Sequence, residues 1–227
     1  MRKTKEERAA MRAQKSAVLR LPSYSLMEEI LNAVSHGLGA LFAVAAIVLM
    51  IVKAAPDVKS VLCVIFYGAT LFILYMVSTL YHALGLNKAK SVFRVFDHCS
   101  IFLLIAGTYT PISLMVIGGA AGWVLFGVLW AAAVLGIVLN AVDMKKFSRF
   151  SAVCYICMGW AVVFAVKPLI DSMPLDSIIL LVLGGVAYTV GAVIYNIGKK
   201  VKYMHSLWHL FVLAGSVLHF ISIWKCI

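Results

Sequence analysis

Charge is scarce in this sequence of 227 residues: only 13% are Asp, Glu, Lys or Arg, whereas 63% are hydrophobic. A soluble domain carries roughly a quarter charged residues and about half apolar ones. The mean hydropathy of +1.01 is therefore too high for one aqueous core, and the composition indicates a membrane protein. We attribute the net charge of +11 to Lys and Arg beside a membrane. Nucleic-acid binding is not expected, because no basic face lies on a soluble domain.

The sequence also offers no sign of a cleaved secretion signal. Residues 1–20 carry seven Lys or Arg, but no apolar core follows directly and no small-residue cleavage site closes the first apolar run. The basic residues are Arg2, Lys3, Lys5, Arg8, Arg12, Lys15 and Arg20. Cys154 and Cys157 spell CxxC within an apolar run and lack a second pair, so we interpret them as packing residues.

What the sequence does contain is long apolar runs. Seven stretches reach the length of roughly 20 residues that a membrane-spanning helix needs. They cover about 30–52, 60–84, 98–117, 121–141, 151–167, 177–197 and 206–224. We predict an all-α integral membrane bundle of seven transmembrane helices over residues 25–227, preceded by a basic arm over residues 1–24. Residues 25–28 spell a capping box before the first span, and Pro111 predicts a kink in the third.

The Lys and Arg residues predict the orientation of the bundle. Sixteen of the twenty lie in the arm or in loops on the same side of the membrane. Because positive residues are retained on the inner side, we expect a cytoplasmic N-terminus and a C-terminus outside. The arm could lie on anionic lipid or simply be a solvated tail, and the sequence leaves both interpretations open.

Histidine is the ionisable residue that enters the predicted spans, where such residues are costly and often functional. His205 and His209 lie four residues apart at the start of the last span, so they share one helix face. This spacing suits a metal ion, but two unrelated interfacial histidines would give the same pattern. The alternating direction of the spans adds His82, which ends the second span on the same side of the membrane.

Three imidazoles at one level, with a fourth position open, are typical of a catalytic zinc site that lowers the pKa of a bound water. We therefore predict that His82, His205 and His209 bind Zn²⁺. Asp97, the carboxylate at the start of the third span, lies at the same level and could hold or deprotonate the water. Ser78 shares a helix face with His82 and could hydrogen-bond to the site.

The other three histidines receive different interpretations. His98 follows Asp97 but points about 100° away on a helix, so we expect a supporting or interfacial role. His36 lies near the inner end of the first span and could support the cluster. His219 lies fourteen residues beyond His205, roughly 21 Å along the helix, and is interpreted as a hydrogen-bonded core residue.

Several short motifs are spread over residues 26–224. They are Glu28-Glu29-Ile30 with Asn32, Ser35-His36-Gly37, Ser78 to His82, Asp97-His98, Ile105 to Pro111, and His205 to His209 with Phe211, Gly215 and His219. Together they resemble the bacterial hemolysin III family, the prokaryotic branch of the progestin and adipoQ receptor superfamily. The resemblance implies a multi-pass protein of the bacterial plasma membrane with seven helices around a zinc ion. By position its three ligands are His82, His205 and His209, with Ser78 and Asp97 as the accompanying serine and aspartate.

The resemblance also implies a relation to alkaline ceramidases and other membrane hydrolases. The first functional prediction is a zinc-dependent hydrolase acting on an amide or ester bond of a membrane lipid. Alternatives are a metal-tied sensor or regulator of membrane state without catalysis, a cytolysin, and a transporter or channel. Permanently apolar spans disfavour a secreted pore-former, and polar groups gathered on one side disfavour a transporter. The sequence leaves the oligomeric state open, and iron, copper or nickel would also suit imidazole ligands.

Overall fold

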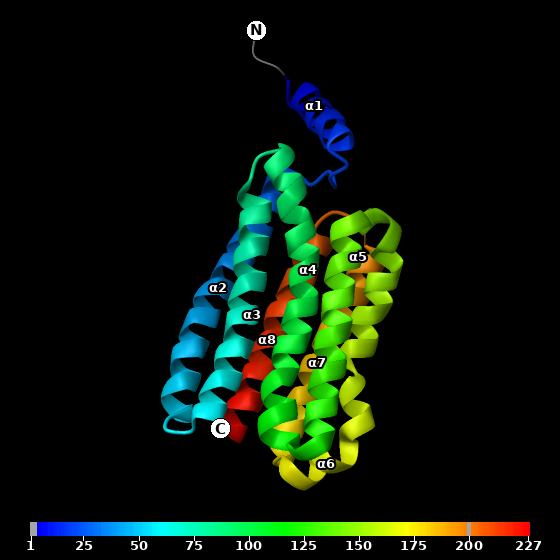
Figure 1. Ribbon diagram of the computed structural model, residues 1–227. Helices are drawn as coiled ribbons and strands as arrows, with labels where there is room; N and C mark the ends of the chain where they lie inside the picture. Colours follow the sequence, from blue (N-terminus) through cyan, green and yellow to red (C-terminus); the bar gives the residue numbers. More distant parts are fainter. Residues whose placement is uncertain (1–3, 199–200) are drawn as a thin grey trace.

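The computed structural model describes residues 4–198 and 201–227, and over those residues the chain forms helices and no strand (Figure 1). The α-helices are α1 (Lys5–Val18), α2 (Leu26–Ala54), α3 (Val58–Ala83), α4 (Lys88–Pro111), α5 (Gly119–Gly159), α6 (Val166–Ser172), α7 (Leu175–Ile197) and α8 (Met204–Cys226). A π-helical segment, η1 (Ile112–Ile117), follows α4, and a 3₁₀ segment, η2 (Ala161–Ala165), precedes α6. The predicted all-α bundle is confirmed.

Six helical stretches in the described residues are long and apolar enough to span a membrane, and the fourth and fifth of the seven predicted spans lie in one of them. The longest stretch, Gly119–Ser172, has 54 residues and would extend roughly 80 Å if it were straight. Asp143 breaks it with extended backbone angles (φ −155°, ψ 87°), and Figure 1 shows the two legs of α5 side by side. The Asp143 carboxylate accepts the Lys146 N–H at 3.0 Å and so caps the second leg.

The helix starts follow local capping chemistry. The predicted capping box is confirmed: the Ser25 side chain accepts the Glu28 N–H, and the Glu28 carboxylate accepts the Ser25 N–H. The third span starts earlier than predicted, because the Asn87 side chain caps α4. Asp97 therefore lies well inside α4 rather than at its start. At Pro111 the helix does not stop but changes from α to π geometry.

Within the described part of the basic arm, residues Lys5–Val18 form helix α1. Figure 1 shows α1 beyond the end of the bundle, and the C-terminus lies at the opposite end. After α1 the Leu21 N–H donates to the Ser16 carbonyl (2.9 Å) and the Arg20 N–H to the Ala17 carbonyl (3.1 Å). With Arg20 in a left-handed conformation (φ 55°) and Leu21 buried, this is a Schellman turn that leads the chain back onto the bundle.

The helices pack through small residues and leave an apolar outer surface. α2 packs on both α3 and α8, α4 joins α3 to α5, and α7 packs on α8. At Gly39 of α2 the backbone approaches the Tyr75 ring of α3 so closely that any side chain would clash. Large apolar side chains such as Leu41 and Phe164 are exposed, as expected for surfaces that face lipid.

Candidate metal centre

Three histidines meet at the end of the bundle that carries α1. His82 comes from the last turn of α3, and His205 and His209 come from the first two turns of α8. The Nε2 atom of His205 lies 3.2 Å from Nε2 of His82 and 3.1 Å from Nε2 of His209. Among the described residues these three form the one group of His, Cys, Asp or Glu ligand atoms that converges within 4.8 Å. The structure thus brings the three predicted ligands together.

The hydrogen bonds around the cluster suit a cation. The Nδ1 atom of His82 lies 2.8 Å from the Glu29 carboxylate, so it carries the proton and leaves the Nε2 lone pair free. The Asn32 amide is 3.4 Å from the same nitrogen, too long to compete with a charge-assisted bond. The Ser35 hydroxyl donates to the Asn32 carbonyl, so its oxygen accepts from Nδ1 of His209 at 3.4 Å.

Two imidazole lone pairs therefore point at His205, whose single Nε2 can donate a proton to only one of them. A metal ion would satisfy all three nitrogens at once. Tetrahedral zinc with Zn–N distances of about 2.0–2.1 Å separates its nitrogen ligands by roughly 3.3 Å, close to the 3.1 and 3.2 Å seen here. The donor set and its spacing fit a metal ion of this kind.

Glu29 connects the cluster to the rest of this end of the bundle. Its carboxylate is buried and also contacts Lys90 at 3.1 Å and Arg12 at 3.3 Å. Sequence reasoning placed Glu29 in a motif but gave it no role in the site. The signal was its spacing, because Glu29, Asn32 and His36 follow one another at i, i+3 and i+7 on the buried face of α2.

Ser78 and His36 are both buried, Ser78 one turn before His82 on α3 and His36 against the His209 ring. Ser78 is 1% exposed, and its hydroxyl has no hydrogen-bond partner among the described residues. The His36 ring stacks on His209 at 3.6 Å and 16°, and neither of its nitrogens has a partner in the described part of the chain. Buried polar atoms without partners are costly. Those of Ser78 and His36 are therefore available to a ligand or a bound water.

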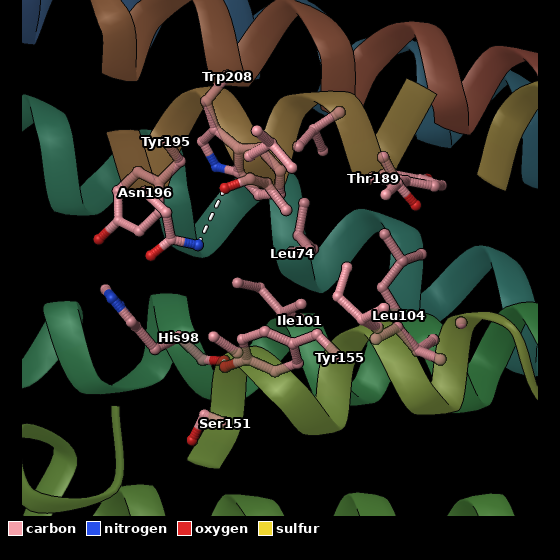
Figure 2. Close-up of a pocket in the computed structure, with 18 of the residues that line it drawn as sticks. Leu74, His98, Ile101, Leu104, Ser151, Tyr155, Thr189, Tyr195, Asn196 and Trp208 are labelled. Carbon is pink, nitrogen blue, oxygen red and sulfur yellow. Dashed lines mark hydrogen bonds between the residues drawn. The ribbon is translucent and has the colours of Figure 1, made fainter. Parts of the chain in front are cut away.

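A cavity of about 260 Å³ reaches the cluster from between α4, α5, α7 and α8. Asp97, His98 and His205 line it at the α1 end, and Figure 2 shows His98 and Tyr155 facing Tyr195 and Trp208 across it. Asp97 is not among the converging ligand atoms; it shares the cavity wall with His205 instead. The His98 ring lies 3.8 Å from the Asp97 carboxylate, and its Nδ1–H donates to the Arg94 carbonyl at 3.0 Å.

The remaining candidates lie apart from the cluster. His219 lines the far part of the cavity, and its Nε2–H donates to the Leu181 carbonyl at 3.0 Å. This confirms His219 as a hydrogen-bonded core residue. Cys154 and Cys157 are free thiols, and Cys157 is exposed on the outer surface of the bundle.

Tyr24 covers the cluster from the side of the arm. Its ring stacks on His205 at 4.9 Å and 21°, and its centroid lies 5.8 Å from that of His82. Burial raises the pKa of the Tyr24 phenol well above its usual value, so this ring stays neutral.

The fold and the site together define a multi-pass membrane protein with a buried three-histidine centre at one end of its bundle, able to hold a metal ion. Residues 24–220 match the family described as Haemolysin-III related, and the chain belongs to that family. The resemblance drawn from the motifs is confirmed.

Curated relatives support the same assignment. The chain is 38% identical to Hemolysin-3 of Bacillus cereus over 198 residues, which cover 86% of this chain and 90% of the relative. It is also 38% identical to the Hemolysin-3 homolog of Bacillus subtilis (strain 168) over 202 residues, covering 88% and 94%. The monocyte to macrophage differentiation factor of Homo sapiens is more distant, at 27% identity over 165 residues, covering 70% and 68%.

Proposed function

We propose that this protein is a zinc-dependent hydrolase that cleaves an amide or ester bond of a membrane lipid in the bacterial plasma membrane. The observation that carries the proposal is the convergence of three Nε2 atoms beside a cavity that reaches into the membrane part of the bundle. The His205 side chain belongs to both the cluster and the cavity wall. A lipid chain in the cavity would therefore place its polar end beside the histidines.

His82, His205 and His209 would hold the zinc ion, which supplies a water of lowered pKa and polarises a carbonyl. Asp97 lines the cavity beside His205, so its carboxylate can take the proton of the attacking water and return it to the leaving amine or alcohol. The unpaired Ser78 hydroxyl can donate a hydrogen bond to the reacting oxygen. The mostly apolar cavity wall would orient the lipid chain and exclude bulk water.

The test begins with the metal content of the full-length protein purified in detergent, measured by mass spectrometry. We expect about one zinc per chain in wild type and none in His82→Ala, His205→Ala or His209→Ala. Lipid amides and esters are then assayed with wild type, Asp97→Asn and Ser78→Ala. Both substitutions should keep the zinc and lower turnover, Asp97→Asn by roughly 10²- to 10⁴-fold, the usual contribution of a general base. Wild-type protein without zinc, or equal turnover in Asp97→Asn, would rule out the mechanism.

A second candidate function is a metal-tied sensor of membrane state without catalysis. It is favoured by the origin of the ligands, because an ion held by His82 and by the pair on α8 would join α3 to α8. This candidate predicts that zinc is retained while no lipid amide or ester is cleaved. Zinc removal should then change the conformation of the bundle, for example its susceptibility to proteolysis.

We also propose that the arm and the metal centre lie on the cytoplasmic side of the membrane. Sixteen of the twenty Lys and Arg residues support this orientation. A reporter enzyme that is active only outside the cytoplasm should be active when fused after residue 227. An inactive reporter would show that the C-terminus lies in the cytoplasm. The proposed orientation would then be wrong, whereas the geometry of the histidine site would be unchanged.

A further inference from the structure

The basic arm makes specific contacts with the end of the bundle that holds the histidines. Its Schellman turn presents the carbonyls of Leu19 and Arg20 to α4, where Ser91 donates to the first at 3.3 Å and Arg94 to the second at 2.7 Å. Leu21 is buried beside this turn. The arm is therefore anchored to α4 through its backbone, independently of its positive charges.

Arg12 links the arm to the carboxylate that supports His82. Its Nε–H donates to the Tyr24 carbonyl at 2.8 Å, and its Nη2 atom lies 3.3 Å from Glu29. Glu29 in turn holds Nδ1 of His82. The Arg12 guanidinium on α1 thus contacts both Tyr24, which precedes α2, and Glu29, whose carboxylate contacts His82.

Tyr24 lies at the other end of this bridge and covers His205. Because its ring stacks on the imidazole face, it limits the rotation of that side chain and covers one side of the cluster. Through Tyr24 and Glu29 the arm therefore acts on two of the three histidines, one on each of the helices that supply them.

We propose that Arg12 and Tyr24 are positioning residues of the metal centre, and that the arm is a cover that slows the release of the metal. This inference rests on the metal site of the proposed function but does not require catalysis there. Tyr24 is the first residue of the range that matches the family, and Arg12 lies outside that range. The link through Arg12 therefore lies outside the part of the chain that matches the family.

The experiment measures zinc release from the full-length protein, loaded with one equivalent of Zn²⁺ in detergent, to an excess of a chelator that changes colour on binding. Two matched pairs isolate the two contacts. Arg12→Gln removes the bridge, whereas Lys15→Gln removes the same charge from an exposed position one turn further along α1. Tyr24→Leu removes the stacked ring, whereas Tyr24→Phe keeps it.

We expect release to be roughly two- to fivefold faster in Arg12→Gln, the range of a partly exposed ion pair. It should be roughly two- to tenfold faster in Tyr24→Leu, the range of an aromatic stack. Lys15→Gln and Tyr24→Phe should release zinc at the wild-type rate. The melting temperature of the metal-free protein should be the same in all four variants, because the cover acts on the site and not on the packing of the bundle.

Several results would overturn the inference: wild-type release rates in Arg12→Gln and Tyr24→Leu, equal acceleration by Lys15→Gln, or acceleration matched by a lower melting temperature of the metal-free protein. A wild type that binds no zinc would overturn both this inference and the metal site. If the wild type binds zinc, the variants release it at the expected relative rates and no lipid is cleaved, only the hydrolase proposal fails.

Discussion

The two ends of the bundle use the same kinds of residue in different ways. At the α1 end, Glu29 and Lys90 are buried as an ion pair, and the Glu29 carboxylate also contacts His82 of the cluster. At the opposite end, Asp176 and Lys225 form an ion pair at 2.6 Å that is about half exposed, and Lys53 lies over the Trp224 ring at 4.7 Å. The charged pair at the second end therefore remains in contact with water, whereas the pair at the first end is buried.

The two ends differ in the free-energy cost of burying charged groups. An exposed ion pair contributes little, since water screens it and both side chains lose freedom. A buried carboxylate and ammonium must compensate each other completely, and leaving one unpaired is strongly destabilising. Ionisable residues buried within a membrane bundle are costly and are often functional. The comparison therefore shows that the buried charges gather at the α1 end, beside the three histidines.

The largest effect should come from Lys90→Met. The Lys90 ammonium donates to the Tyr81 and Leu84 carbonyls at the end of α3, at 2.6 and 3.1 Å, as well as to Glu29. Methionine fills the space but leaves those acceptors unpaired, so we expect a loss of about 3–5 kcal/mol of stability. Thermal unfolding in detergent measures it, with Asp176→Asn at the other end as the control. Equal melting temperatures for the two variants would remove the distinction between the ends.

Glu29→Gln should have the next largest effect, on metal affinity. Glutamine has the shape of glutamate but loses the charge that faces His82 and a bound cation. Removing a carboxylate that supports a ligating histidine typically weakens metal binding about 10- to 100-fold. Competition for Zn²⁺ with a chelator of known affinity measures the change. Glu28→Gln is the matched control, because the neighbouring Glu28 carboxylate contacts the backbone of Ser25 and Tyr203 rather than a histidine. An unchanged zinc affinity in Glu29→Gln would show that the buried Glu29 charge does not contribute to metal binding.

The sequence allowed the architecture to be predicted because the membrane imposes length and hydropathy on every span. The alternating direction of the spans then placed His82 beside His205 and His209. Hydropathy also separated the spans predicted over 121–141 and 151–167. The loop expected between them remains helical apart from Asp143, and no Gly or Pro marks that break. Asp97, which was predicted to act on a bound water rather than as a ligand, lies on the cavity wall with His205 and outside the converging ligand atoms.

The polar contacts around the histidines could not be obtained from the span count. Glu29 is buried against His82 because α2 packs on α3 with one particular face, and rotation about the helix axis is set by packing. The contacts of Arg12 and Tyr24 depend on a left-handed turn at Arg20, a residue with no special tendency to adopt it. The sequence therefore predicted that the three histidines lie at one depth in the membrane, but not which side chains contact them.

The smallest effect should come from Asp57, which caps α3 at the end far from the histidines. The hydroxyl and the backbone N–H of Ser60 donate to its carboxylate and lower its pKa below the usual value. A carboxyl with a lowered folded pKa stabilises the fold above its unfolded pKa, and this contribution is lost as the pH falls through the folded value. Asparagine also caps helices but does not titrate. Relative to Asp57→Asn, the wild-type melting temperature should therefore be constant above about pH 5 and should fall below about pH 4. A difference that persists unchanged to pH 2 would show that this exposed end is insensitive to the charge of its cap.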